Sequence, residues 1–163
     1  MDSEPSFMCD AMLGGLARWL RAAGYGAVFD AHIADGELVR RSLEERLCLL
    51  TSDSGVLERY AVVQGLVRCV FVPKDQPPVQ QLAHVMRELD LGLRRPRCMK
   101  CGGELEDVSL DQVEDQVPPK VRAACDRFFR CVGCGKAYWR GTHWRGIRQR
   151  LRRAVRLARG SPP

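Results

Sequence analysis

The sequence lacks the features that would hold a chain in a membrane or mark it for export. None of its 163 residues belongs to an apolar run approaching the ~20 residues that a membrane-spanning helix needs. Its N-terminal segment starts acidic and has no basic stretch followed by an apolar run, which is not the pattern of a signal peptide. We therefore expect a soluble, cytoplasmic protein.

Aromatic residues are few, at 7%, and only three histidines are present. The composition is still that of a globular protein, because 45% of the residues are hydrophobic and 28% are charged, a mixture that excludes a disordered chain. The length allows one ordinary domain, or a small domain with an added module.

Eight cysteines would suit a disulfide framework in a secreted protein, but cytosolic thiols stay reduced. Cys9, Cys48 and Cys69 each stand alone in an apolar run, where a free cysteine usually behaves as a small buried hydrophobic residue. Cys125 is expected to be a packed residue as well, with a role as a spare metal ligand left open.

The other four cysteines form two CxxC pairs and predict a structural Zn²⁺ site. Each pair offers two thiolates and is followed by a glycine, where the tight turn needs a positive φ. Four thiolates leave no open coordination position, so the ion would fold the module rather than catalyse. The alternative, a thioredoxin-like redox motif, should open a helix after a strand, whereas these pairs lie in glycine-rich turns. The predicted zinc ligands are Cys98, Cys101, Cys131 and Cys134.

Charge divides the chain into two parts. Residues 1–93 contain 9 Lys/Arg against 13 Asp/Glu, whereas residues 94–163 contain 17 against 7. An acidic part joined to a basic part suggests a cation site beside a phosphate-binding surface. We predict an acidic α/β domain over residues 1–93, a zinc ribbon over 94–145 and an arginine-rich tail over 146–163.

Short apolar runs alternate with helical patterns throughout the acidic part. This alternation, with short links, predicts an α/β fold in which helices flank a parallel sheet. It stops at the expected linker 91–97, after which the ribbon and a basic C-terminal helix follow. Strands are expected at residues 6–9, 26–29, 47–51 and 66–72, with helices after Asp10, Asp35, Asp53 and Pro77.

Aspartates mark the ends of the predicted strands. Asp10, Asp30 and Asp53 follow the first three strands, and Asp35 opens a helix. The carboxyl ends of parallel strands share one edge, and carboxylates gathered there need a cation between them. Oxygen ligands select Mg²⁺ or Mn²⁺, which suit phosphodiester hydrolysis. In the alternative interpretation, Asp10, Asp35 and Asp53 are only helix N-caps.

The segment from Lys136 to Arg159 has nine Lys/Arg and no acidic residue, and aromatic residues lie between its arginines. This combination favours phosphate contacts and stacking on single-stranded bases. The alternative is a solvated helix whose aromatic residues pack on the ribbon. The predicted nucleic-acid contacts are Arg140, Trp144, Arg145, Arg148 and Arg152.

Several motifs, in order, resemble the Mut-7 C-terminal ribonuclease domain family, whose PIN-like domain carries a zinc ribbon. The similar segments run from Phe7 to Leu151. They are DAMLGGLARWLRAAGY, ADGELV, LLTSD, RCMKCGGEL and FFRCVGCGKAYWRGTHW. The resemblance implies a PIN-like parallel sheet, acidic residues that coordinate Mg²⁺ or Mn²⁺, and cleavage of RNA.

Residue by residue, the resemblance assigns metal coordination and catalysis to Asp10, Asp35 and Asp53. Ser52 replaces the basic residue usual before the last of these, which leaves one phosphate or substrate contact open. Gly26 stands where the family often has an aspartate. The weaker candidates are Asp30, Asp75 and Glu37.

The leading hypothesis is therefore a metal-dependent ribonuclease. Its aspartates would hold an ion that activates water for in-line attack on phosphorus, while the ribbon and the tail hold RNA. The alternative is a non-catalytic RNA- or ribosome-binding adaptor. A toxin-like nuclease acting on one structured RNA is a third hypothesis.

Overall fold

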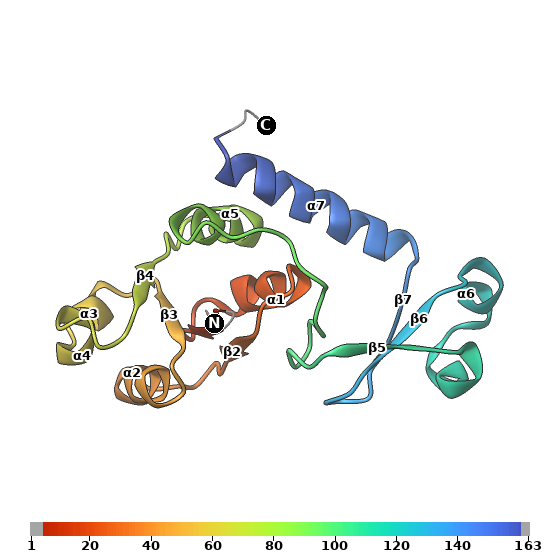
Figure 1. The fold of residues 1–163 in the computed structure, drawn as a ribbon, viewed down its shortest axis with the longest axis horizontal. Coiled ribbons are helices and arrows are strands. Elements are labelled where there is room, and N and C mark those ends of the chain that lie inside the picture. Colours follow the sequence, from red (N-terminus) through yellow and green to blue (C-terminus); the bar gives the residue numbers. More distant parts are fainter. Residues whose placement is uncertain (1–4, 161–163) are drawn as a thin grey trace.

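The computed structural model describes residues 5–160, which form two sheets (Figure 1). The larger sheet is parallel, with its four strands in the order β2-β1-β3-β4. The two central strands are buried along their whole length, as expected for a sheet covered on both faces. The strands are β1 (Phe7–Cys9), β2 (Ala27–Phe29), β3 (Cys48–Thr51) and β4 (Cys69–Phe71).

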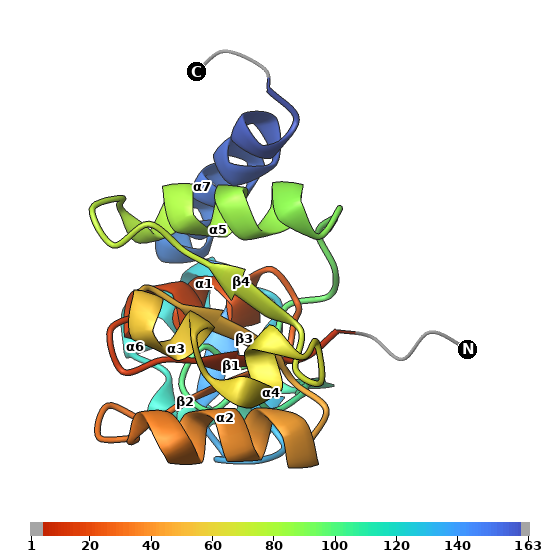
Figure 2. The same ribbon diagram turned by 90° about the vertical axis from the view of Figure 1, so that its left-hand side faces the viewer.

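Helices flank this sheet, and Figure 2 shows α1 and α5 on the side opposite α2. They are α1 (Gly14–Ala22), α2 (Asp35–Glu44), α3 (Ser54–Leu57), α4 (Tyr60–Val63) and α5 (Pro78–Glu88). Successive strand side chains point to opposite faces and so supply two cores. Phe7 and Leu50 pack with α1 and α5, whereas Met8 and Leu49 pack with α2, α3 and α4. The predicted α/β fold class is confirmed.

The smaller sheet is antiparallel, in the order β5-β6-β7, and it carries the four-cysteine module. A helical insert between its first two strands packs on one face, where Val113, Val117, Phe128 and Ala137 form a small core. The strands are β5 (Leu105–Val108), β6 (Phe128–Cys131) and β7 (Ala137–Trp139). The insert contains two 3₁₀ turns, η1 (Leu110–Gln112) and η2 (Glu114–Gln116), and the helix α6 (Pro119–Ala124).

The basic C-terminal segment is a long helix, α7 (Thr142–Ala158), that packs against α1 and α5 of the first domain, the part built on the parallel sheet. Its buried residues Ile147, Leu151 and Ala154 belong to the same core as α1 and α5, and Figures 1 and 2 show α7 crossing α5. The predicted division between residues 145 and 146 therefore falls inside one helix. The predicted outer limits, residues 1 and 163, lie outside the described residues. No helix within residues 5–160 is long and apolar enough to cross a membrane.

The linker 91–97 is tied to the end of α1. The backbone N–H groups of Arg94 and Arg97 donate to the carbonyls of Ala23 and Arg21 at 2.9 Å. Gly24, directly after Ala23, has a φ of +100°, and a Cβ there would lie 2.5 Å from the Arg94 Cβ. Glycine is therefore required at this position, where the linker crosses α1.

The buried side chain of Arg21 links the parallel-sheet part of the molecule to the four-cysteine module. Its guanidinium is buried and donates to the carbonyls of Ala27, Met99 and Lys100 at 2.7–3.1 Å. The last two carbonyls belong to the first CxxC turn, so one α1 side chain holds the metal module against the parallel sheet.

Several local expectations are corrected. Asp35 is the first residue of α2 rather than its N-cap, because Ala34 takes the extended N-cap conformation. Asp10 is not the N-cap of α1 either, since Leu13 holds that place. The expected helix after Asp53 divides into two, because Arg59 is extended, with ψ of 136°. The expected strand 66–72 is reduced to Cys69–Phe71.

Candidate metal sites and basic face

The four CxxC cysteines come together at one point. Their Sγ atoms all lie within 4.8 Å of one another, with Cys98–Cys134 at 3.7 Å and Cys101–Cys131 at 3.4 Å. Tetrahedral Zn²⁺ with Zn–S bonds of about 2.3 Å requires Sγ–Sγ separations of about 3.8 Å. The cluster has the ligands and the spacing to hold a structural metal such as zinc, as the sequence predicted.

The turns around the cluster explain its glycines. Gly102 and Gly135, just after the second cysteine of each pair, have φ of 82° and 73°, which confirms the predicted left-handed turns. Gly103 was not predicted to have a role, but a Cβ there would lie 2.8 Å from the Cys131 Sγ. The two adjacent glycines of the CGG sequence could have indicated this close approach. Backbone N–H groups of Gly103 and Gly133 lie 3.4 Å from the sulfurs of Cys101 and Cys131.

Tyr138 was also missed, and it contacts a metal-site sulfur directly. Its hydroxyl lies 3.0 Å from the Cys98 Sγ, and the Lys136 ammonium lies 5.4 Å from its ring centre. Burial raises the pKa of Cys98, but hydrogen bonds from Tyr138 and from backbone N–H groups outweigh it and lower the pKa to about 6. Burial and the adjacent Cys98 raise the pKa of Tyr138. A thiolate has no proton to donate, so Tyr138 would be the donor in this contact when Cys98 binds a metal as a thiolate.

The other cysteines stay outside the cluster. Cys9 and Cys48 are buried and Cys69 is half-buried, in agreement with their predicted packing role. Burial raises the pKa of both Cys48 and Cys69 to about 11, so these thiols are neutral at pH 7. Cys125 packs against the small core of the antiparallel sheet (the ribbon core), and its Sγ donates to the Arg140 carbonyl at 3.6 Å. It is not a spare ligand in this arrangement.

Asp10 lies directly after the central strand β1 and is only 6% exposed. Its Oδ2 accepts hydrogen bonds from the Thr51 hydroxyl at 2.8 Å and from the Ser52 N–H at 2.7 Å. Its Oδ1 accepts one from the Met12 N–H at 2.9 Å. A carboxylate accepts about four hydrogen bonds, so one acceptor position on Oδ1 remains.

Asp53 is linked to Asp10 through Thr51. The Thr51 hydroxyl that donates to Asp10 also accepts from the Asp53 N–H at 3.0 Å. The exposed carboxylate of Asp53 caps α3, because its Oδ1 accepts from the Gly55 N–H at 2.8 Å. The predicted capping role is confirmed, and the second carboxylate oxygen is left for another partner.

Asp30 and Asp35 are both exposed. Asp30 follows β2, and its Oδ1 accepts from the His32 N–H at 2.9 Å. Asp35 lies in the first turn of α2, and its Oδ2 is 3.7 Å from the Arg59 guanidinium. Both carboxylates therefore already have partners on or near the protein surface.

The structure does not bring the three predicted carboxylate ligands into one tight cluster. Within residues 5–160, the four cysteines form the single group of three or more potential ligands whose atoms lie within 4.8 Å of one another. Mg²⁺ usually keeps several waters and is held by one or two carboxylates together with substrate phosphates. Asp10 and Asp53 both lie at the carboxyl end of neighbouring strands and are the two carboxylates to which that smaller requirement would apply.

The arginines of α7 form a basic face. Arg145, Arg148, Arg152 and Arg156 line a groove of about 340 Å³ with Gln149. Arg156 was missed, although it stands one further helical turn after Arg152. Trp144 is half-buried and packs on the core shared by α1 and α5.

Arg140 lies apart from this groove. Its guanidinium is 5.7 Å from the Phe129 ring centre, in the smaller sheet. Trp139 packs against the ribbon core. The predicted contact residues thus divide between the α7 face, the ribbon and the buried side of α7.

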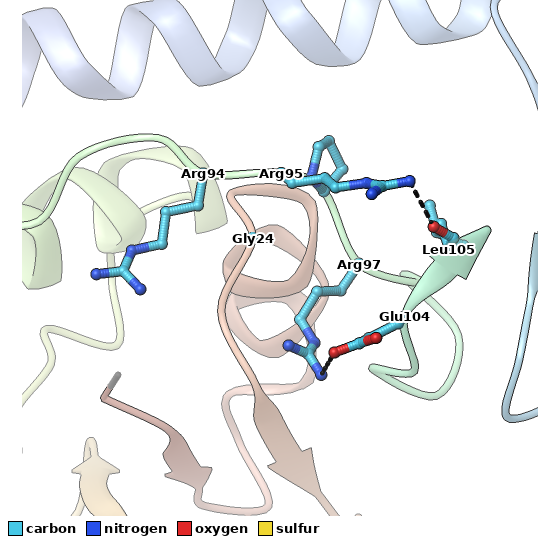
Figure 3. A pocket seen from close by; sticks show the side chains of 7 residues that line it. Gly24, Arg94, Arg95, Arg97, Glu104 and Leu105 are labelled. Atoms are coloured by element: carbon cyan, nitrogen blue, oxygen red, sulfur yellow. Dashed lines mark hydrogen bonds and ion pairs between the residues drawn. The ribbon is translucent and has the colours of Figure 1, made fainter. Parts of the chain in front are cut away.

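A second pocket, of about 250 Å³, lies where the linker meets the smaller sheet (Figure 3). Although arginines line it, its polar groups are engaged with the protein. Arg95 donates to the Leu105 carbonyl at 2.9 Å, and Arg97 donates to the Gly102 carbonyl at 2.8 Å. This pocket belongs to the junction between the two sheets.

The model of the Mut7-C RNAse domain family matches residues 5–151, which is nearly the whole chain. The chain belongs to this family. Comparison with curated proteins and comparison with solved structures each found no match. Membership in the Mut7-C RNAse domain family confirms the resemblance predicted from the sequence motifs and indicates a nuclease-like role with RNA as the substrate class.

The match spans both parts of the molecule. It begins before β1 and ends within α7, at Leu151, one of the residues that pack this helix against α1 and α5. The parallel sheet, the four-cysteine module and α7 as far as Leu151 are therefore all included in the family domain.

Proposed function

We propose that the protein is a metal-dependent ribonuclease whose site is the carboxyl edge of the parallel sheet. The observation that carries the proposal is the Asp10–Thr51–Asp53 network. The Asp10 carboxylate accepts three hydrogen bonds, and the Thr51 hydroxyl that donates one of them also accepts from the backbone N–H of Asp53, whose carboxylate is exposed. Two aspartates fixed in this way at one edge of the sheet suit a site that binds a cation. Family membership supports RNA as the substrate.

Asp10 and Asp53 would hold Mg²⁺ or Mn²⁺, with Asp35 as a third carboxylate. A divalent ion supplies charge neutralisation at the phosphate and makes a bound water more acidic. Thr51 orients the Asp10 carboxylate, since its hydroxyl donates to Oδ2 at 2.8 Å. Ser52 donates its N–H to the same oxygen and its hydroxyl to the Val72 carbonyl, so it is committed to the structure.

The second part would hold the RNA. A structural Zn²⁺ would fold the four-cysteine module, and the arginines of α7 would contact phosphates. Arg21 would keep the module in place through its bonds to Met99 and Lys100, so that bound RNA meets the carboxylates in one orientation.

Cleavage of labelled RNA in Mg²⁺ or Mn²⁺ tests the proposal. Asp10→Asn and Asp53→Asn should each lower the rate on the order of 100-fold, because loss of metal coordination costs several kcal/mol of transition-state stabilisation. Asp111→Asn, an exposed aspartate of the ribbon insert, is the matched control and should leave the rate unchanged. Circular dichroism checks that each variant is folded.

Two outcomes would contradict the proposal. A rate unaffected by both substitutions would exclude this edge as the site. Intact RNA binding without cleavage in either metal would instead favour the adaptor, in which the Asp53 carboxylate is only a helix cap.

A further inference from the structure

The arginine face of α7 has a regular geometry. Arg145, Arg148, Arg152 and Arg156 recur at intervals of three or four residues, so they lie on one side of the helix. At 1.5 Å per residue the row is about 16 Å long, with neighbouring arginines about 4.5–6 Å apart along the axis. The row therefore offers evenly spaced cations on a rigid support.

These charges have no acidic partner among the residues that the structure describes. None of the ion pairs formed by residues 5–160 involves the four arginines, and the sequence has no acidic residue after Asp126. Arg40 of α2, by contrast, is paired with Glu37 and Glu44 of the same helix, and Arg41 with Glu45 at its C-cap. The α7 row thus needs anions from outside the described chain.

The tryptophans and the tyrosine near the row are engaged in contacts within the protein. Trp144 packs on the core, Trp139 packs on the ribbon and Tyr138 contacts Cys98. Binding of single-stranded RNA typically depends on aromatic side chains on which the bases stack, whereas duplex RNA is recognised through its shape and its phosphates.

We infer that the α7 row binds the phosphate backbone of a double-helical RNA segment, so that the substrate is a structured RNA with a stem. The inference rests on the proposed function for its catalytic part only. A rigid row of cations matches the preformed backbone of a stem and gives sequence-independent binding. It replaces the expectation that aromatic residues stack on single-stranded bases.

Fluorescence anisotropy tests the inference with a labelled RNA hairpin and an unstructured oligouridine of equal length, both without added divalent metal. Arg148→Gln/Arg152→Gln removes two charges from the row. Arg150→Gln/Arg153→Gln removes two charges from exposed arginines outside the groove, and so serves as the matched control. Both variants keep the buried side of α7, and thermal unfolding checks that they are equally stable.

The wild type should bind the hairpin more tightly than the oligouridine. The row variant should bind the hairpin roughly tenfold more weakly, and its slope of log K against log salt should be smaller by about 2, while the control changes much less. Equal losses in the two variants, or equal wild-type affinity for both RNAs, would overturn the inference.

This result is separate from the catalytic test. If hairpin binding depends on the row but Asp10→Asn leaves cleavage unchanged, the proposed site fails and the inference stands. If Asp10→Asn abolishes cleavage but the two RNAs bind and are cut equally well, the inference fails and the proposed site stands.

Discussion

The two sheets of this molecule are stabilised in different ways. The parallel sheet has fully buried apolar side chains on both faces, such as Phe7, Met8, Leu49 and Leu50. The antiparallel sheet has a small core on one face and a cluster of four thiols near its end. Small modules that cannot bury enough apolar surface usually need a metal or a disulfide. Burial therefore accounts for the folding of the first part, whereas we expect the second part to depend on a bound ion.

The ion pairs of the second part do not change this conclusion. Arg122 with Glu114, Arg127 with Asp107 and Arg130 with Glu106 are all substantially exposed. Exposed pairs typically contribute only about 0–1 kcal/mol each to stability, so they cannot compensate for the small size of the core.

Loss of the predicted metal ligand Cys131 should therefore give the largest difference in stability between the two parts. Cys131→Ser should unfold the smaller sheet, because structural zinc contributes roughly 10–16 kcal/mol of binding free energy to folding in small modules. Amide exchange measured by NMR should show loss of protection in β5, β6 and β7, with β1 and β3 still protected.

Cys125→Ser is the matched control, since Cys125 lies in the same module but outside the thiol cluster. It should retain the metal and the protection of all three strands. If the smaller sheet stays protected in the metal-free Cys131→Ser variant, its own core is sufficient to keep it folded. The two parts would then both be stabilised by burial.

Much of this organisation could be predicted from local patterns. The runs around Met8 and Leu49 predicted the parallel strands, because continuous apolar residues are what a doubly covered sheet needs. The CxxC spacing predicted which cysteines meet, since each turn fixes two sulfurs at once. Aspartates after strands predicted a shared edge, which Asp10 and Asp53 confirm through Thr51.

The remaining features depend on contacts between distant segments. Nothing local distinguishes Arg21 from its exposed neighbour Arg18, because its partners Met99 and Lys100 lie far along the chain. Likewise, the many arginines of α7 led to the prediction of an arginine-rich tail. The docking of its apolar side became evident only from the positions of α1 and α5 in the fold. Tyr138 reaches Cys98 only because β7 lies beside the first CxxC turn.

The α7 helix joins the two parts, and substitution of Leu151 tests how much its packing stabilises the first domain. Leu151 is 4% exposed in the core of the first domain. Leu151→Ala should lower the free energy of unfolding by about 2–5 kcal/mol in a urea titration, the usual cost of a buried leucine. Leu66→Ala, at a leucine that is 58% exposed, is the control and should cost less than about 1 kcal/mol. A loss no greater than that of the control would mean that α7 adds little to the first domain.

Tyr138→Phe should give the smallest effect, and it tests the metal site without removing a ligand. The substitution deletes the hydroxyl that lies 3.0 Å from the Cys98 Sγ and leaves the ring in place. A hydrogen bond to a thiolate ligand offsets part of its charge, and loss of such an outer contact typically weakens metal binding by about 10–100-fold. Competition with a chromophoric zinc chelator measures this change, and Tyr60→Phe, at a tyrosine that is 75% exposed, is the matched control. Equal zinc affinity in the two variants would show that the four thiolates and their backbone donors hold the ion without help from Tyr138, so that the second part would depend on its cysteines alone.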